Sequence, residues 1–416
     1  MGQDAASAKT VVLLGTLDTK GIEYGFVRER LHEAGLRTIL LDTGILGSPQ
    51  VAADISREEV ALAGGASLPD LIASGDRGAA VGAMAAGAVK LVSQLYASGN
   101  LDGILGLGGS GGTAIATQAM RALPVGVPKL MVSTMASGDT RPYVGGSDLM
   151  LMHSVVDIAG INQLSARILS NAAAAMAGMV AAAPVLLPEN KPLVGATMFG
   201  VTTPAVMAGR QRLEELGYEV LVFHATGAGG QSFEQLIRDG FIQASFDLTT
   251  TELADDLVGG VLSAGPKRLE AAGDMEIPQV VSLGALDMVN FGPRQTVPEK
   301  FQQRLLYEHN PTVTLMRTTP EECAELGRRI ARKLNQSKGP VTLFVPLKGV
   351  SAIASEGNVF HDPLADEALL TALREQLDRQ VVEVRELDME INDPRFAIAM
   401  AEHLHELYQQ KHTRGK

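Results

Sequence analysis

The sequence holds one cysteine and no tryptophan among its 416 residues, and aromatic residues make up 4% of the chain. The single cysteine, Cys323, excludes an internal disulfide framework and fits a reducing compartment. Residues 1–10 lack the charged-then-apolar order of a signal peptide. We therefore expect a cytoplasmic protein.

Positive charge is also scarce, because 35 Lys and Arg residues stand against 47 Asp and Glu residues, which gives a net charge of −12. The chain has no run of basic residues, and this disfavours nucleic acid as a direct partner. The eight histidines are scattered, and none has the spacing of a metal-ligand set with Cys323. We therefore expect no metal ion held by side chains.

The longest stretch without charge is residues 168–188, and its length raises the question of a membrane span. It is mostly alanine, it contains Pro184, and its strongly apolar residues are sparse. These features favour a buried or interface helix within residues 160–182, and we expect no membrane partner.

One pattern is present twice, once in each half of the chain. Residues 11–42 and residues 193–224 each show an apolar run, a turn with glycine and threonine, an amphipathic segment and a second apolar run. This order is that of a strand, a loop, a helix and a strand. A repeated unit of this kind predicts two similar α/β halves with a ligand in the cleft between them.

Short apolar runs that do not alternate with polar residues predict strands of parallel sheets, covered on both faces. These runs lie near 10–15, 37–41, 103–107, 129–133, 219–223, 278–283, 312–316, 341–345 and 381–385. Amphipathic segments predict helices near 20–34, 57–63, 78–97, 112–122, 204–216, 231–239, 252–264, 299–308, 319–335, 364–379 and 393–410.

The predicted fold class is therefore α/β, with two Rossmann-like three-layer halves whose sheets are mainly parallel. The N-terminal domain is expected over residues 1–188 and the C-terminal domain over residues 189–416, with Pro184, Pro188 and Pro192 marking the boundary. We place the alanine-rich helix as a hinge or packing element between the halves.

The repeat extends past its first unit when later segments of the two halves are compared. Residues 101–120 align with 256–275, and residues 127–139 align with 277–287. Both pairs predict a turn, a helix, a strand led by proline, and a loop with glycine and aspartate.

The loop after the first strand carries Thr16, Asp18, Thr19 and Lys20. Backbone N–H groups at a helix start, together with hydroxyls and a cation, can receive a phosphate, and the carboxylate can hold Mg²⁺ through water. The alternative is that Asp18 or Thr19 only caps the helix. We favour the phosphate site, because a cap does not need the lysine.

The loop after the third strand is denser in glycine and matches the pattern Gly-x-Gly-x-x-Gly between a strand and a helix. It lacks the Gly-Lys-Ser/Thr of a Walker A motif, and no acid follows at the spacing of a dinucleotide fingerprint, which disfavours NAD. The alternative is a turn for close packing. We predict an anion site, formed by Gly108, Gly109, Ser110, Gly111, Gly112 and Thr113.

Two further residues complete the predicted nucleotide site. Asp42 ends the second strand, where an acid is well placed for a pair of ribose hydroxyls. A role as a helix cap or turn cap is an equal alternative for Asp42. Arg141 follows the fourth strand and is a second candidate for phosphate.

In the second half, comparable loops are expected to hold the substrate through Gly200, Thr202, Thr203, Thr226 and Gly227. Three later residues are candidates for acid–base catalysis, and these are Lys348, His361 and Asp362. The alternative for Asp362, followed by a proline, is a plain helix start. The alternative for His361 is a surface position.

Taken together, these motifs resemble the Tm-type ATP-binding domain family, many of whose bacterial members are stand-alone proteins. The resemblance rests on residues 11–31, 106–113, 135–148, 161–179, 195–204 and 344–363. It implies ATP binding, a fold of two α/β subdomains and a homodimer, and it implies no particular reaction.

The hypothesis that we favour is an ATP-binding metabolic enzyme that acts on a small anionic substrate in the cleft, with Mg²⁺ carried by the phosphates. One alternative is a regulatory protein that binds a nucleotide or a partner without catalysis. A second alternative is an enzyme that binds a phosphosugar or sugar acid directly and uses no nucleotide.

Overall fold

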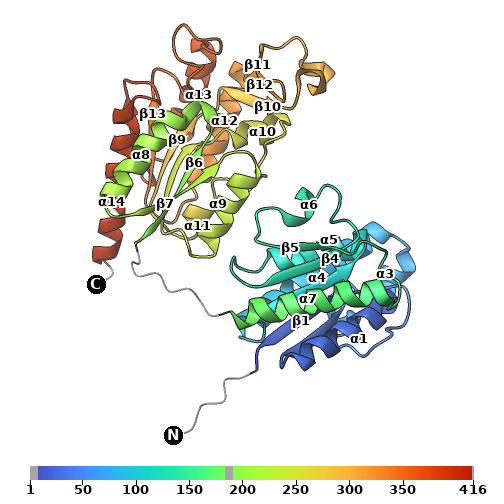
Figure 1. Ribbon diagram of the computed structural model, residues 1–416. Coiled ribbons are helices and arrows are strands. Elements are labelled where there is room, and N and C mark those ends of the chain that lie inside the picture. Colours follow the sequence, from blue (N-terminus) through green and yellow to red (C-terminus); the bar gives the residue numbers. More distant parts are fainter. Residues whose placement is uncertain (1–7, 183–190, 415–416) are drawn as a thin grey trace. The chain divides into compact units, whose positions relative to one another are not determined.

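The computed structural model describes residues 8–182 and 191–414. The chain divides into two compact units, Met1–Leu186 and Leu187–Lys416, and each is described by itself (Figure 1). Both units are α/β with parallel main sheets, as the sequence predicted. The expected cleft between the halves stays a prediction. Pro184 and Pro188 lie outside the described residues.

The sheet of the N-terminal unit has five parallel strands in the order β2-β1-β3-β4-β5. The strands are β1 (Thr10–Gly15), β2 (Arg37–Asp42), β3 (Gly103–Gly108), β4 (Lys129–Ser133) and β5 (Met150–His153). Every residue of β1, β3 and β4 is buried, because helices cover both faces of the sheet. The sequence analysis missed β5, a short edge strand whose residues are half-buried or exposed.

Helices pack on both faces of this sheet (Figure 1). On one face lie α1 (Leu17–Glu33) and α7 (Gln163–Ala181). The other face carries α2 (Arg57–Ala63), α3 (Leu68–Ser74), α4 (Arg77–Ala97) and α5 (Ser110–Arg121). A short helix, α6 (Arg141–Val144), precedes β5.

The alanine-rich helix α7 is a core helix of the N-terminal unit, and its expected placement between the halves stays a prediction. Its buried residues Leu169, Ala172, Ala173 and Met176 repeat at helical spacing and pack against the sheet and α1. By length and composition, α4 and α7 are apolar enough to cross a membrane. Each, however, contributes one face to the core of this unit.

The main sheet of the C-terminal unit has six parallel strands in the order β14-β13-β9-β8-β6-β7. The strands are β6 (Leu193–Met198), β7 (Glu219–His224), β8 (Ala244–Thr249), β9 (Gln279–Gly284), β13 (Val341–Pro346) and β14 (Val382–Leu387). On one face lie α8 (Thr203–Glu215) and α14 (Pro394–Arg414). The other face carries α9 (Ala228–Arg238), α10 (Glu252–Val258), α11 (Ala271–Asp274), α12 (Pro320–Leu334) and α13 (Pro363–Gln376).

A small antiparallel sheet is inserted between β9 and β13, in the order β10-β12-β11. Its strands are β10 (Met288–Phe291), β11 (Leu306–Asn310) and β12 (Val313–Arg317). The predicted helix at 299–308 is therefore wrong, because a single 3₁₀ turn, Glu299–Phe301, is followed by β11. The pairing of β11 with β12 outweighs the local helical pattern.

One further expectation needs correction, and one is confirmed. The helix predicted over 252–264 ends at Val258, because Gly259 has a φ of 95° and closes α10 in the left-handed conformation. The capping box of α12, formed by Thr319 and Glu322, is present as predicted.

The two main sheets share one strand order, since β2-β1-β3-β4-β5 corresponds to β7-β6-β8-β9-β13. The repeat of 11–42 in 193–224 therefore relates β1, α1 and β2 to β6, α8 and β7. The alignment of 101–120 with 256–275 is wrong, because the counterpart of β3 is β8 at 244–249. In this doubly wound order the chain reverses between β1 and β3, which is where ligands bind in open α/β sheets.

Candidate functional site

A cavity of about 490 Å³ lies in the N-terminal unit at the carboxyl ends of β1 and β3. It is lined by residues 16 and 18–20 after β1, residues 43, 45 and 46 after β2, residues 108–112 at the end of β3, and parts of α3 and α4. The cavity thus brings together the predicted loops after the first and third strands, at the reversal point of the sheet. Its volume falls within the range that holds small-molecule ligands.

The N-terminus of α5 forms one wall of this cavity. Gly109 is the N-cap residue, and no side chain caps the helix. A Cβ atom at Gly109 or Gly111 would meet only ordinary contacts, 3.7 Å from Thr134 Oγ1 and 3.6 Å from Arg77 Nη2. The first N–H groups of α5 therefore border open space, and the positive end of the helix dipole favours an anion there.

The other members of this loop have packing roles. A Cβ at Gly108 would lie 3.0 Å from the Cα of Gly112, so the strand end and the helix approach closely. Thr113 is fully buried, and its hydroxyl shares a hydrogen bond of 2.7 Å with Ser133 Oγ. Ser110 and Gly112 line the cavity, whereas Thr113 lies in the core behind it.

Two cations line the cavity, Lys20 and Arg77. The backbone of α1 is kinked at Lys20, with φ −128° and ψ 16°, and the ammonium group donates a hydrogen bond to the carbonyl of Ile158. Arg77 is the first residue of α4, directly after the N-cap Asp76. The sequence analysis missed Arg77, which stands one residue before the helix predicted there. The proximity of Arg77 Nη2 to Gly111 places this charge beside the start of α5.

The remaining residues of the first loop hold its shape. The hydroxyls of Thr16 and Thr19 share a hydrogen bond of 2.9 Å. Asp18 Oδ2 accepts hydrogen bonds from the backbone N–H groups of Leu46, at 2.7 Å, and Gly47, at 3.2 Å. Neither Asp18 nor Thr19 caps α1, because that helix has no side-chain cap. Asp18 instead connects the first loop to the loop after β2.

Opposite these polar groups the lining of the cavity is apolar. The apolar side chains come from the loop after β2 and from α3, α4 and α5, and they are Ile45, Leu46, Leu71, Ile72, Val81, Met84 and Ile115. Leu46 is 83% exposed and Ile72 is 51% exposed. Large apolar side chains that remain open to solvent beside a cluster of polar groups are typical of a ligand site.

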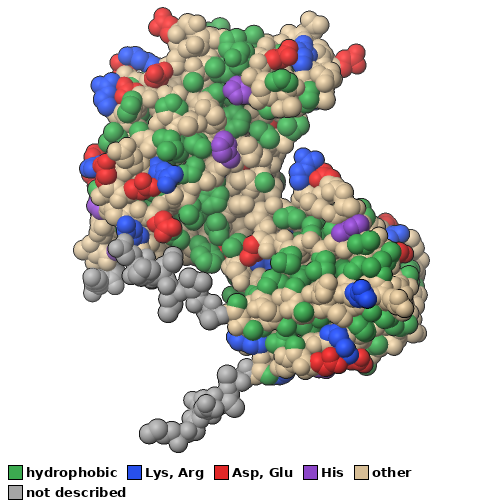
Figure 2. Space-filling view, in the orientation of Figure 1, with side chains coloured by type: hydrophobic (Ala, Val, Ile, Leu, Met, Phe, Trp, Pro, Cys, Tyr) green, Lys and Arg blue, Asp and Glu red, His purple; other side chains and the backbone are tan. Residues whose placement is uncertain are grey.

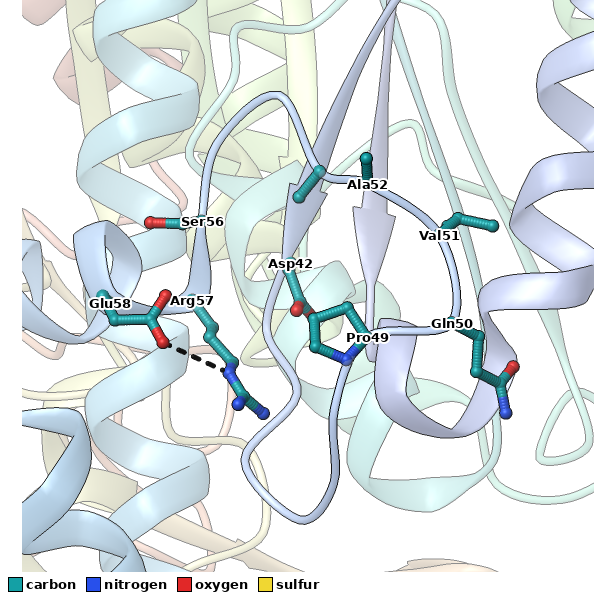
Figure 3. Close-up of a pocket in the computed structure, with 9 residues that line it drawn as sticks. Asp42, Pro49, Gln50, Val51, Ala52, Ser56, Arg57 and Glu58 are labelled. Carbon is teal, nitrogen blue, oxygen red and sulfur yellow. Dashed lines mark hydrogen bonds and ion pairs between the residues drawn. The ribbon is translucent and has the colours of Figure 1, made fainter.

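Asp42 does not line this cavity. It lines a neighbouring hollow of about 430 Å³ with Pro49, Gln50 and Arg57 (Figure 3). Its Oδ1 accepts hydrogen bonds from Leu17 N, at 3.0 Å, and Gly44 N, at 2.8 Å. Asp42 is buried, and burial raises the pKa of its carboxyl. The structure thus shows a turn-holding role for Asp42, the alternative left open above.

Arg141 also stands apart from the glycine loop. It begins α6, its side chain is exposed, and it forms an ion pair of 2.7 Å with Asp139. It is not among the residues that line the cavity.

In the C-terminal unit, carboxylates of the chain itself occupy two helix starts. Glu252 is buried and accepts hydrogen bonds from Gly227 N, at 2.7 Å, and Gly230 N, at 3.0 Å, at the start of α9. Glu234 accepts from Leu269 N and, at the start of α11, from Ala271 N. At both helix starts the anion is therefore a carboxylate of the chain itself.

Buried Arg268 balances these charges. It forms ion pairs of 2.7 Å with Glu252 and 2.5 Å with Asp247, and one of 3.4 Å with Glu234. Burial alone would lower the pKa of the Arg268 guanidinium, but the three carboxylates raise it overall.

Two residues predicted to hold the substrate lie beside this cluster. The backbone N–H of Gly227 already donates to Glu252. Thr226 is an exposed residue whose hydroxyl donates to the carbonyl of His224.

The loop after β6 is held by its own hydroxyls. Thr202 is fully buried, and its Oγ1 shares a hydrogen bond of 2.8 Å with Thr249 Oγ1. The Thr203 hydroxyl donates to the carbonyl of Phe199 at 3.2 Å. Gly200 is exposed and has open space around its Cα. Of these residues, Gly200 offers the most accessible backbone.

The three residues proposed for acid–base catalysis have local partners. Lys348 forms an ion pair of 2.9 Å with Asp388, and His361 Nδ1 lies 3.3 Å from the carbonyl of Ala354. Asp362 is the N-cap of α13 and accepts hydrogen bonds of 3.1 Å from Leu364 N and Ala365 N. The helix-start interpretation of Asp362 thus describes what its side chain does in the structure.

Two observations concern metal ions and nucleic acid, which the sequence analysis discussed as partners. In the described ranges, no group of three or more His, Cys, Asp or Glu residues is arranged to hold a metal ion. On the face shown in Figure 2, acidic and basic side chains are interspersed among apolar ones.

Comparison with known proteins gives the family. Residues 9–184 match the N-terminal domain, and residues 191–408 the C-terminal domain, of the Uncharacterised protein family UPF0261. A UPF0261 protein of Clostridium tetani is 56% identical over 396 residues, which is 95% of this chain and 98% of that protein. The UPF0261 protein RA0729 of Rhizobium meliloti is 47% identical, over 94% of this chain and 97% of its own.

A plant relative shares part of its length with this chain. The ToMV resistance protein Tm-1(GCR237) of Solanum lycopersicum is 48% identical over 332 residues, which cover 78% of this chain and 44% of that protein. Among solved structures, a UDP-N-acetylglucosamine 2-epimerase from Rickettsia bellii aligns over 97% of this chain and 96% of its own, at 11% identity. Its TM-score of 0.22 is too low to indicate a shared fold. The two domain matches and these relatives show that the chain belongs to the UPF0261 family.

Proposed function

We propose that the N-terminal unit binds ATP, with the phosphates at the start of α5 and the adenine against the apolar wall. The observation that carries this proposal is an uncapped helix N-terminus beside two cations, Lys20 and Arg77, in one cavity at the reversal point of the sheet. Backbone N–H groups and cations recognise phosphate oxygens, and an apolar surface suits a base. The resemblance to the Tm-type family supports the same ligand.

Mg²⁺ enters this proposal as an ion carried by the phosphates. The described residues offer no cluster that would hold it alone, and Mg²⁺ is commonly bound through substrate phosphates with few protein ligands. Asp18 lines the cavity and can contact such an ion through water.

We further propose that the protein is a metabolic enzyme that uses ATP on a small anionic substrate, and that it works as a cytoplasmic homodimer. A second candidate is a regulatory protein that binds the nucleotide without turning it over. One observation favours this second candidate, since Lys348, His361 and Asp362 each hold local structure. ATP turnover, measured with and without a panel of sugar acids, separates the two.

The binding proposal is tested by calorimetric titration of ATP and Mg²⁺ into the full chain. Arg77→Ala and Lys20→Ala should each weaken binding by about 1.5–3 kcal/mol, the scale of a hydrogen bond to a charged group. Lys90→Ala is the matched control, because Lys90 is an exposed cation on the same helix as Arg77 but outside the cavity.

Three results would contradict this placement. Absence of binding at millimolar ATP would remove the nucleotide altogether. Binding of a sugar phosphate in its place would support the reading without a nucleotide. Equal losses in Arg77→Ala and Lys90→Ala would show that the cations act only through the overall charge.

A further inference from the structure

Three helices begin at the ligand cavity. Its lining includes residues 16 and 18–20 at the start of α1, residues 76 and 77 at the start of α4, and residues 108–112 at the start of α5. These helices have 17, 21 and 12 residues, so each presents the positive end of a full helix dipole. Three positive ends beside one cavity suit a ligand with several negative charges, such as a chain of phosphates.

The polar side chains that can reach a ligand lie among these helix starts. Arg77 is exposed, and its guanidinium has no ion pair among the described residues. The ammonium group of Lys20 donates to the carbonyl of Ile158 and keeps further donors for a ligand. Ser110, the first residue of α5, adds an exposed hydroxyl. All three groups donate hydrogen bonds, which phosphate oxygens accept.

The other polar side chains of the lining are engaged within the protein. Thr16 and Thr19 share a hydrogen bond of 2.9 Å. Asp18 accepts from two backbone N–H groups of the loop after β2, and Asp76 accepts from a backbone N–H of α4 at 3.0 Å. Thr43 is 2% exposed. These side chains shape the cavity, and the groups left for recognition are those that suit phosphate.

The apolar wall of the cavity gives little means to tell one base from another. Its side chains are hydrocarbon except for that of Met84, whose sulfur is a weak acceptor. Adenine and guanine differ in the donors and acceptors on their ring edges. A site rejects an analogue strongly when its own polar groups are matched to the ligand, whereas an apolar surface discriminates little.

From this division of the cavity we infer that the site selects its ligand by the phosphate chain and accepts nucleoside triphosphates as a class. The inference rests on the proposed ATP site and widens its ligand beyond ATP. In the competing arrangement a backbone group at the wall recognises adenine, and that arrangement requires a clear preference for ATP.

The test is calorimetric titration of the wild-type chain with ATP, GTP, inorganic triphosphate and adenosine, the three triphosphates together with Mg²⁺. We expect ATP and GTP to bind within about threefold of each other, because the wall does not read the base edge. Inorganic triphosphate should bind, although more weakly than the nucleotides. Adenosine should bind at least about 100-fold more weakly than ATP, because it lacks every charge-assisted hydrogen bond.

Two variants separate the phosphate contacts from the wall. Arg77→Ala should weaken ATP, GTP and inorganic triphosphate alike. Ile72→Ala removes a side chain of the wall that is 51% exposed, so it should weaken ATP and GTP by one common factor of about five and leave inorganic triphosphate unchanged. Leu62→Ala is the matched control, since Leu62 is a 76% exposed apolar residue of α2 outside the cavity.

Failure of the inference is distinct from failure of the ATP proposal. If neither nucleotide binds, the ATP site itself is wrong. If ATP binds more than tenfold tighter than GTP, or if ATP binds and inorganic triphosphate does not, the site holds ATP but the base is recognised, and the inference is overturned. The wild-type comparison decides this even if a variant fails to fold.

Discussion

Replacing Gly111 by valine should remove ligand binding and leave the folded chain almost unchanged. Gly111 is the second residue of α5, and a Cβ there would meet only Arg77 Nη2, at 3.6 Å. The glycine-to-valine change gains a few tenths of a kcal/mol in helix propensity, so the ligand-free stability should move by less than about 0.5 kcal/mol. The added side chain, however, projects toward the cation beside the proposed phosphate position.

The magnitude of the lost ligand effect follows from linkage. At ATP concentrations near 100 times the dissociation constant, the wild-type chain should gain about 2.7 kcal/mol. For a unit of this size that corresponds to a rise of about 5–11 °C in melting temperature. Gly111→Val should show no rise.

Thermal unfolding with and without ATP and Mg²⁺ measures both quantities. Gly178→Val is the matched control, because Gly178 is an exposed glycine in α7 with open space around it. It should melt like the wild type and keep the full ligand effect. A Gly111→Val chain that retains the ATP-dependent rise would refute the reasoning and leave the glycine loop as a packing turn.

Three other changes probe separate parts of the molecule. Gly106→Val should destabilise the N-terminal unit by about 1–3 kcal/mol, because a Cβ there lies 2.8 Å from Met131 Sδ and 2.9 Å from Ala116 Cβ; unchanged urea unfolding would contradict this. Burial raises the pKa of Asp255 to about 7, so the folded chain keeps a proton that the unfolded chain releases above pH 4. The stability of the wild type relative to Asp255→Asn should therefore be highest below pH 4 and fall by up to about 4 kcal/mol by pH 8, and a difference that is flat with pH would sink the idea. Lys348→Ala should keep ATP affinity, and any turnover should fall by ~100-fold; calorimetry beside a turnover assay checks this, and loss of ATP binding would place the nucleotide in the C-terminal unit.

Much of the fold could be predicted because most of its strands are local apolar runs, and β1, β3 and β9 end in glycine. The strand β8 was missed, since its sequence carries Asp247 in the interior, and the partners that make this carboxylate tolerable in a core, Arg268 and Thr197, are distant in the sequence. The strand β11 was taken for a helix because its partner β12, rather than its own pattern, determines its conformation. In both cases the decisive interaction lies between segments that the local sequence does not relate.

The candidate site was predictable to a similar degree. The loops at 16–20 and 108–112 were identified from glycine, hydroxyls and Lys20, and the structure brings them into one cavity. Arg77 and Thr43 gave no comparable signal. Arg77 belongs to a different helix, α4, and Thr43 is a buried residue directly after β2. The use of Asp42 by Leu17 N and Gly44 N depends on a turn that sequence reasoning had no means to resolve.

The carboxylates of Glu252 and Glu234 give the two related units different kinds of stability. In the C-terminal unit the anions at the helix starts are covalent parts of the chain, so their effective concentration never changes. In the N-terminal unit no side chain caps the start of α5. If the proposed nucleotide binds there, the stability of the N-terminal unit would rise with nucleotide concentration, whereas the helix starts of the C-terminal unit need no such ligand.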